Sequence, residues 1–212
     1  YITVHASETL EPCYVNTGFN INYAANSLTY SKTVGQRRGG TKVGDRLLSG
    51  DFGIGTGLSE NWDVGLNIPV LLNQEIDDSK GVSYFESRGI NEIRFNTKYK
   101  FFDDGDMGGF AGVFTVNQNL ISDNPFAGEN PGPTSHYEIV WDRKFNPFTA
   151  AVNFGYRRRL PGDQIPNVPF TPMQDQWIFS AAGSYYSTRL DTKFVFEIFG
   201  ARPAEPTSQD TD

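Results

Sequence analysis

The sequence predicts an all-β protein, an up-and-down antiparallel β-barrel with about nine strands in this chain. Apolar and polar residues alternate with a period of two along most of the 212 residues, as they do in strands whose two faces differ. No convincing 3.6-residue period is present. The connectors between the predicted strands alternate strictly between long and short, which is the rhythm of an up-and-down barrel and not of a Greek-key sandwich.

The clearest element is a hairpin over residues 90–120, which reads INEIRFNTKYKFF, then DDGDMGG, then FAGVFTVNQNL. One face of its first strand is apolar or aromatic and the other is charged or polar. The apolar set is Ile93, Phe95, Thr97, Tyr99 and Phe101, and the polar set is Glu92, Arg94, Asn96, Lys98 and Lys100. After the Asp/Gly turn, Phe110, Phe114 and Val116 alternate with Ala111, Thr115 and Asn117 in the same way.

The other elements repeat this pattern in order. Residues 1–13 are irregular apart from a short strand expected at residues 2–5. Further strands are expected at residues 14–23, 47–59, 62–70, 92–101, 110–117, 136–142, 148–156, 176–185 and 194–198. Long connectors are expected at residues 26–46, 73–89, 121–134 and 158–173, and short turns near Ser59, Asp104, Asn146 and Arg189. Pro69 cannot donate to a ladder, so we expect it near a strand end, where pairing stops.

The composition suits a barrel that spans a membrane. The chain has 17 Phe and 10 Tyr, yet its mean hydropathy is only −0.44, because apolar residues are spread singly among polar ones. No run approaches the roughly 18 apolar residues of a membrane helix. Alternating barrel strands cancel in a windowed average, and strands of roughly 9–12 residues suit tilted membrane strands. We therefore predict a transmembrane β-barrel over residues 14–200, a periplasmic N-terminal segment over residues 1–13, and a polar tail over residues 201–212 that begins an extracellular loop.

The alternation assigns each strand residue to one of two faces. The face predicted to meet lipid carries Phe19, Ile21, Phe52, Ile54, Val64, Leu66, Ile68, Phe95, Phe114, Val116, Val152, Phe154, Phe179, Phe194 and Phe196. Aromatic residues expected at the two headgroup levels are Tyr23, Trp62, Tyr99, Phe101, Tyr137, Trp141, Tyr156, Trp177 and Tyr185. The polar face predicted to line the lumen carries Glu92, Arg94, Lys98, Lys100, Glu138, Asp142, Arg157, Lys193 and Glu197.

Charge and motifs exclude several functions. A net charge of −7 leaves no basic stripe for nucleic acid, and we interpret Arg157-Arg158-Arg159 as charges of a loop or rim. His5 and His136 lack metal-ligand spacing, so no metal site and no cofactor are expected. The Asp-rich sequence at residues 103–106 lacks the length of a calcium loop and is interpreted as a hairpin turn. No nucleophile-elbow motif is present, and we expect no catalytic residues and no enzyme activity. Cys13 is the single cysteine and forms no disulfide within this sequence.

Two stretches resemble a known family. DFGIGTGLSENWDVGLNIPVLL, residues 51–72, resembles the hairpin of Gram-negative outer-membrane barrels, in which a Gly-alternating strand meets a short turn that ends in Asp-Val-Gly-Leu. GINEIRFNTKYKFF, residues 89–102, resembles the strand that follows in the same proteins. The resemblance is to barrels fused to OmpA-type domains and to barrels of the phenol-degradation transporter type, and it runs over residues 14–200. It implies a location in the outer membrane of a Gram-negative bacterium.

The strand count departs from that family. Complete members close with a last strand that pairs with the first, often with a terminal aromatic, and bacterial single-chain barrels have even strand numbers. An odd count of about nine leaves unpaired edges that lipid does not tolerate. We therefore expect this chain to be an incomplete fragment of a barrel of about 12 strands, with the remaining strands beyond residue 212.

Several functions follow from this architecture. We expect an outer-membrane structural anchor or a small porin-like channel, with long extracellular loops for surface contacts. One alternative is a barrel scaffold that holds a partner protein or a lipid in its lumen or on its wall, and another is a soluble ligand-binding β-sandwich. Inward charges either pair and fill a narrow barrel or line a wet pore. The expected partners are outer-membrane lipid, the remaining strands and another membrane protein, but not nucleic acid.

Overall fold

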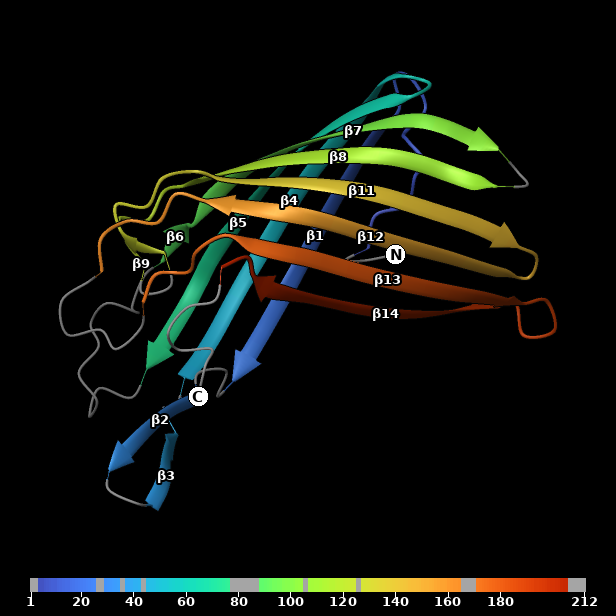
Figure 1. Cartoon of the computed structure of the whole chain (residues 1–212). Helices are drawn as coiled ribbons and strands as arrows, with labels where there is room; N and C mark the ends of the chain where they lie inside the picture. The colour runs from blue at the N-terminus through green and yellow to red at the C-terminus, as the bar shows by residue number, and fades with distance from the viewer. Residues whose placement is uncertain are drawn as a thin grey trace.

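The computed structural model describes residues 4–25, 29–34, 37–42, 45–76, 88–104, 107–124, 127–164 and 171–205. This part of the chain is all-β and contains no helix. Its main sheet follows the order β1-β4-β5-β7-β8-β11-β12-β13-β14, and every neighbouring pair is antiparallel. The sheet curls into a half-barrel (Figure 1). The predictions of an all-β fold and of about nine strands in an up-and-down order are therefore confirmed.

The strands of the half-barrel are long, as the alternation predicted. Their bounds are β1 Val15–Ala25, β4 Asp45–Ser59, β5 Trp62–Ile76, β7 Glu92–Asp104, β8 Gly108–Asn119, β11 Thr134–Phe145, β12 Phe148–Arg159, β13 Gln176–Ser187 and β14 Thr192–Pro203. Turns of a few residues join β4 to β5, β7 to β8, β11 to β12 and β13 to β14, and all four lie at one end, called here the short-turn end. The longer connectors lie at the other end, called the long-connector end (Figure 1).

Several boundaries differ from the sequence-based expectations. The first long connector contains a hairpin of β2 Thr29–Val34 and β3 Arg37–Lys42, because its polar residues pair with each other. Two further short pieces, β9 Asp123–Asn124 and β10 Gly128–Glu129, pair within the connector from β8 to β11. Of the short strand expected at residues 2–5, Val4 and His5 are not in a strand, and the other two residues lie outside the described part of the chain. Most of the polar tail also lies outside it.

Pro69 does not lie at a strand end as expected, since β5 continues for several residues beyond it. The ladder between β5 and β7 stops at the pair Asn67–Arg94, two residues before the proline. The missing N–H of Pro69 therefore falls where no β7 residue would accept it. Its carbonyl accepts a hydrogen bond of 3.1 Å from Asn91 N–H, beside the short strand β6 Gly89–Ile90.

The sheet buries little apolar surface. Most of the buried apolar side chains form two small clusters on the concave face, Ala111 with Val113 and Val140, and Val4 with Ala151 and Ala182. Large apolar side chains on the convex face are exposed, for example Phe19 at 64% and Phe196 at 70%. Within the described residues, no second sheet covers this face. The two outer strands of the sheet, β1 and β14, do not pair with each other in the described part.

Candidate functional site: the concave face and the segment that crosses it

Residues 4–13 lie across the concave face of the half-barrel, in its short-turn half. The segment is held by inward side chains from four strands, Asp63 of β5, Lys98 of β7, Asp142 of β11 and Asn153 of β12. It then reaches the end of β4, where Cys13 N–H donates to Gly57 O at 3.1 Å. The chain turns there, with Cys13 at a φ of 67°, and enters β1. Its thiol is free and exposed.

Two polar side chains fix the start of the segment. Asn153 is almost fully buried, and with its amide oriented to satisfy the network it donates to His5 O at 3.0 Å and accepts from His5 N–H at 2.8 Å. Asp142 accepts from Ser7 N–H at 3.0 Å and from Ser7 Oγ at 2.6 Å. Buried backbone groups need such partners when no strand supplies them. These contacts therefore replace a ladder along an irregular segment.

The second half of the segment is held by an ion pair. Lys98 Nζ lies 3.5 Å from Asp63 Oδ2 and donates to Ala6 O at 3.3 Å. The same Asp63 carboxylate accepts from Leu10 N–H at 3.1 Å. Glycines make room for the segment, because a Cβ on Gly57 would overlap the carbonyls of Leu10 and Glu11.

Burial and charge tune two side chains of the segment. Burial, together with the nearby Lys98 ammonium, holds the pKa of His5 below its usual value of 6.5, and Asp63 opposes this shift. The imidazole is therefore neutral at pH 7. Glu8 pairs with Lys144 of β11. The hydrogen bond from Lys144 is the main cause that lowers the pKa of the Glu8 carboxyl.

A polar cavity of about 530 Å³ occupies the long-connector half of the concave face, with His5 at its floor. The strands β5, β7, β8, β11 and β12 line it, and its charged residues are Glu92, Arg94, Glu138, Arg157 and Arg159. Arg94 is neutralised, since it pairs with Glu92 and lies 3.5 Å from Asp51. A second cavity of about 1000 Å³, with a lining of polar and apolar residues, lies between the segment and strands β1, β4, β5 and β7.

All lumen candidates of the sequence analysis take register positions on the concave face. The structure divides them into groups. Glu92, Arg94, Glu138 and Arg157 line the 530 Å³ cavity. Lys98 and Asp142 hold the N-terminal segment. Lys100, Lys193 and Glu197 lie elsewhere on the same face.

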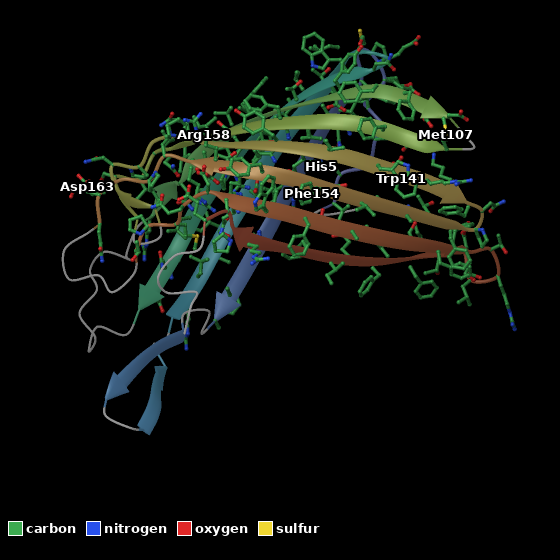
Figure 2. The ribbon with its side chains drawn as sticks, viewed as in Figure 1. His5, Met107, Trp141, Phe154, Arg158 and Asp163 are labelled. Carbon is green, nitrogen blue, oxygen red and sulfur yellow. The ribbon has the colours of Figure 1, made fainter. Side chains whose placement is uncertain are left out.

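The candidates for lipid contact and for the aromatic girdles all lie on the convex face. Some of the aromatic candidates form rows across neighbouring strands. Phe114 and Tyr137 have ring centroids 5.0 Å apart, and Tyr156 and Trp177 have centroids 4.9 Å apart. Phe101 sits at a register shift of β7 and keeps its ring beside Tyr99 and Phe110. Figure 2 places Arg158 and Asp163 toward the long-connector end, and Met107 and Trp141 toward the other.

The sequence did not reveal two parts of this site. The segment over residues 4–13 has no periodicity, so nothing in it predicted that it would cross the concave face. Arg159 was interpreted only as a charge of a loop or rim, whereas Arg157 was also predicted to face the lumen. β12 continues through Arg159, and the period of two turns Arg157 and Arg159 inward and Arg158 outward. Extending the alternation by one more pair of residues would have found Arg159.

Two further kinds of feature are absent from the described part of the chain. Among the described residues, no group of three or more His, Cys, Asp or Glu side chains could hold a metal ion. No helix in the described part of the chain is long and apolar enough to cross a membrane. Comparison with protein-family models and with curated proteins gives no match.

Proposed function

We propose that this chain forms most of the wall of a β-barrel in the outer membrane of a Gram-negative bacterium, where it serves as a structural anchor whose lumen is narrowed by residues 4–13. The observation that carries the proposal is the distribution of charge on the convex face. Charged side chains there occur only within the last three residues at either end of a strand. They are Arg46, Glu75, Asp104, Arg143, Arg158 and Arg202.

Between those ends, the convex face carries no charged side chain, and most of its residues are apolar or aromatic. On β12 it runs from Phe148 to Tyr156. Eight steps of roughly 3.3 Å, tilted by roughly 40°, cover about 20 Å, close to the apolar band of roughly 25 Å in outer-membrane barrels. In water, each exposed Phe or Ile would forgo about 2 kcal/mol of burial free energy. Lipid contact supplies that burial without a second sheet.

The side chains of Trp62 and Trp141 also suit an apolar environment. Trp62 Nε1 donates to Thr97 Oγ1 at 2.6 Å. Trp141 Nε1 donates to Met107 O at 3.1 Å. An indole N–H in an apolar environment needs such a partner. The convex face therefore offers satisfied indoles to lipid.

Within the described residues, β1 and β14 are the outer strands of the sheet, and each has an edge without a neighbouring strand. Each unpaired backbone group in lipid costs several kcal/mol. We therefore infer that further strands, on the same or on another polypeptide, join β14 to β1 in a barrel of about 12 strands. These strands and outer-membrane lipid are the proposed partners.

The position of residues 4–13 favours an anchor over an open pore, because the segment crosses the lumen near the short-turn end. The cavities beside it, of about 530 and 1000 Å³, favour a small channel as the second candidate function, with the segment as its restriction. Planar-bilayer conductance separates the two. The Asp142→Ala variant removes the acceptor of both Ser7 hydrogen bonds. Higher conductance in this variant than in the parent supports a restricted channel, whereas no conductance in either supports an anchor.

Membrane integration itself has a direct test. The protein, extracted with detergent from its native membranes, should migrate faster on a gel before boiling than after it, as a compact barrel does. Release from the membranes by high salt without detergent would overturn the proposal. Under that outcome the apolar convex face would have to be covered by protein.

A further inference from the structure

The 530 Å³ cavity in the long-connector half of the concave face has an unusual concentration of unused hydrogen-bonding groups. Arg157 and Arg159 occupy alternate positions of β12 and both line this cavity. Arg157 Nη1 and Arg159 Nη2 each donate to the same acceptor, Gln176 Oε1, at 3.1 Å. Two positive charges thus share one neutral amide oxygen.

Neither guanidinium forms an ion pair within the described residues, whose ion pairs do not include Arg157 or Arg159. The Glu138 carboxylate on the same cavity wall acts on Arg157 electrostatically without pairing with it. The Nε–H groups of both arginines are buried and have no hydrogen-bond partner. The nearby Asp175 carboxylate is already occupied, because it accepts from Tyr156 Oη at 2.6 Å and from Arg159 N–H at 2.7 Å. Guanidinium forks bind carboxylate or phosphate oxygens in pairs, so the cavity offers unused donors to an anionic ligand.

The same cavity also contains unused acceptors. Asn117 Oδ1 and Asn91 Oδ1 are buried and unpartnered, and the Asn117 residue is only 8% exposed. A buried acceptor without a donor destabilises the folded state. The ligand that satisfies these oxygens must carry hydroxyl or ammonium hydrogens.

The sheet register sets the distance between the two kinds of group. Arg94, Asn117, Thr134 and Arg159 are consecutive cross-strand neighbours on β7, β8, β11 and β12. Asn117 and Arg159 are therefore two strand spacings apart, or about 10 Å between backbones. Both side chains line the cavity of about 530 Å³, which has room for a molecule of sugar size.

We propose that this cavity binds a small hydroxylated anion, a sugar phosphate or a sugar acid. Its phosphate or carboxylate group contacts Arg157 and Arg159, and its hydroxyl groups donate to Asn117 Oδ1 and Asn91 Oδ1. The site faces the interior of the half-barrel, so its ligand is a free solute and not a lipid headgroup. This inference rests on the concave face alone and stands whether or not the convex face contacts lipid.

The test is a titration of the full chain, labelled with ¹⁵N and kept folded in detergent, with three probes: glucose 6-phosphate, glucose and inorganic phosphate. The Nε–Hε signals of Arg157 and Arg159 report the anion, and the side-chain amide signal of Asn117 reports the hydroxyl groups. We expect glucose 6-phosphate to shift all three signals and to bind about tenfold more tightly than inorganic phosphate, the gain expected for hydrogen bonds worth about 1.4 kcal/mol. Glucose alone should bind more weakly still.

Two variants and a matched control locate the site. Arg157→Gln should weaken glucose 6-phosphate binding about tenfold or more. Asn117→Ala should weaken glucose 6-phosphate but leave inorganic phosphate unchanged. Arg158→Gln removes the same charge from the convex face of the same strand. It should change neither the affinity for glucose 6-phosphate nor the affinity for inorganic phosphate.

Either of two results would overturn the inference. One is equal loss of binding in Arg158→Gln and Arg157→Gln, which would indicate general charge attraction. The other, which needs no variant, is that glucose and glucose 6-phosphate shift the same signals with the same affinity.

Discussion

The side-chain amide of Asn153 forms a pair of hydrogen bonds with the backbone of His5, as the backbone of a neighbouring strand would. Asn153 belongs to a strand, whereas His5 does not. The Asn153 amide pairs with the N–H and the carbonyl of His5, at 2.8 and 3.0 Å. The amide stands in for a strand backbone and anchors residues 4–13 inside the half-barrel. The start of the segment thus depends on this buried side chain of β12.

Replacing Asn153 with alanine should therefore release the start of the segment. Both backbone groups of His5 would lose their partner in a buried position, at a cost of about 1–3 kcal/mol each. We expect hydrogen exchange of the Ser7 amide to accelerate by at least about tenfold, since each 1.4 kcal/mol is a factor of ten. Asn20→Ala, at an exposed concave position of β1, is the matched control and should leave this rate unchanged. Equal rates in both variants would contradict the anchoring role.

A second prediction concerns the glycine that lets the segment pass. In Gly57→Ala, the new methyl would overlap the carbonyls of Leu10 and Glu11, and such overpacking costs about 1–3 kcal/mol. Limited proteolysis should cut residues 4–13 faster in this variant. Gly18→Ala offers a clean comparison, because no atom lies within 4 Å of the added Cβ, and its cleavage rate should match the parent. Slow cleavage in Gly57→Ala would show that the segment does not depend on this close approach.

Docking of the segment should weaken in acid. The pKa of His5 is lowered in the folded state, so neutral His5 favours docking fully above its usual value of 6.5, and this contribution falls as pH drops below 6.5 toward the folded pKa. The pKa of Glu8 is also lowered, from 4.5, and its smaller contribution is lost at still lower pH.

Exchange protection at Ser7, corrected for intrinsic rates, should therefore decline in two stages. His5→Gln should remove the first stage, which starts near pH 6.5, and keep the second. If the exchange protection of the parent rose as pH falls from 7 to 5, the predicted weakening of docking in acid would be contradicted.

If the convex face contacts lipid, a new charge should destabilise the protein more in the middle of the apolar band than near its edge. Phe154→Arg places a charge in the middle of the apolar band and should cost about 2–4 kcal/mol on folding into vesicles. Gln118→Arg, one residue from the end of β8 on the same face, should cost about 0–1 kcal/mol. Urea titration of the vesicle-inserted protein measures both. Similar costs at the two positions would indicate a convex face in contact with protein or water.

The alternation of residues was sufficient to predict the strands and their two faces, because a period of two is a local property. Residues such as Phe19 and Arg94 could therefore be assigned to a face without coordinates. The position of the N-terminal segment was not predictable, since Ser7 and His5 contact residues more than a hundred positions away. The continuation of β5 past Pro69 depends on where the β7 ladder stops, which is also a property of the register.

The central claim is that the convex face contacts lipid, and tryptophan fluorescence tests it most directly. The chain has 3 Trp, and Trp62, Trp141 and Trp177 all lie on the convex face. In vesicles of lipids brominated on their acyl chains, most of the fluorescence should be quenched relative to unbrominated vesicles, while acrylamide in the water should quench little. Full fluorescence in brominated vesicles together with strong acrylamide quenching would contradict the account.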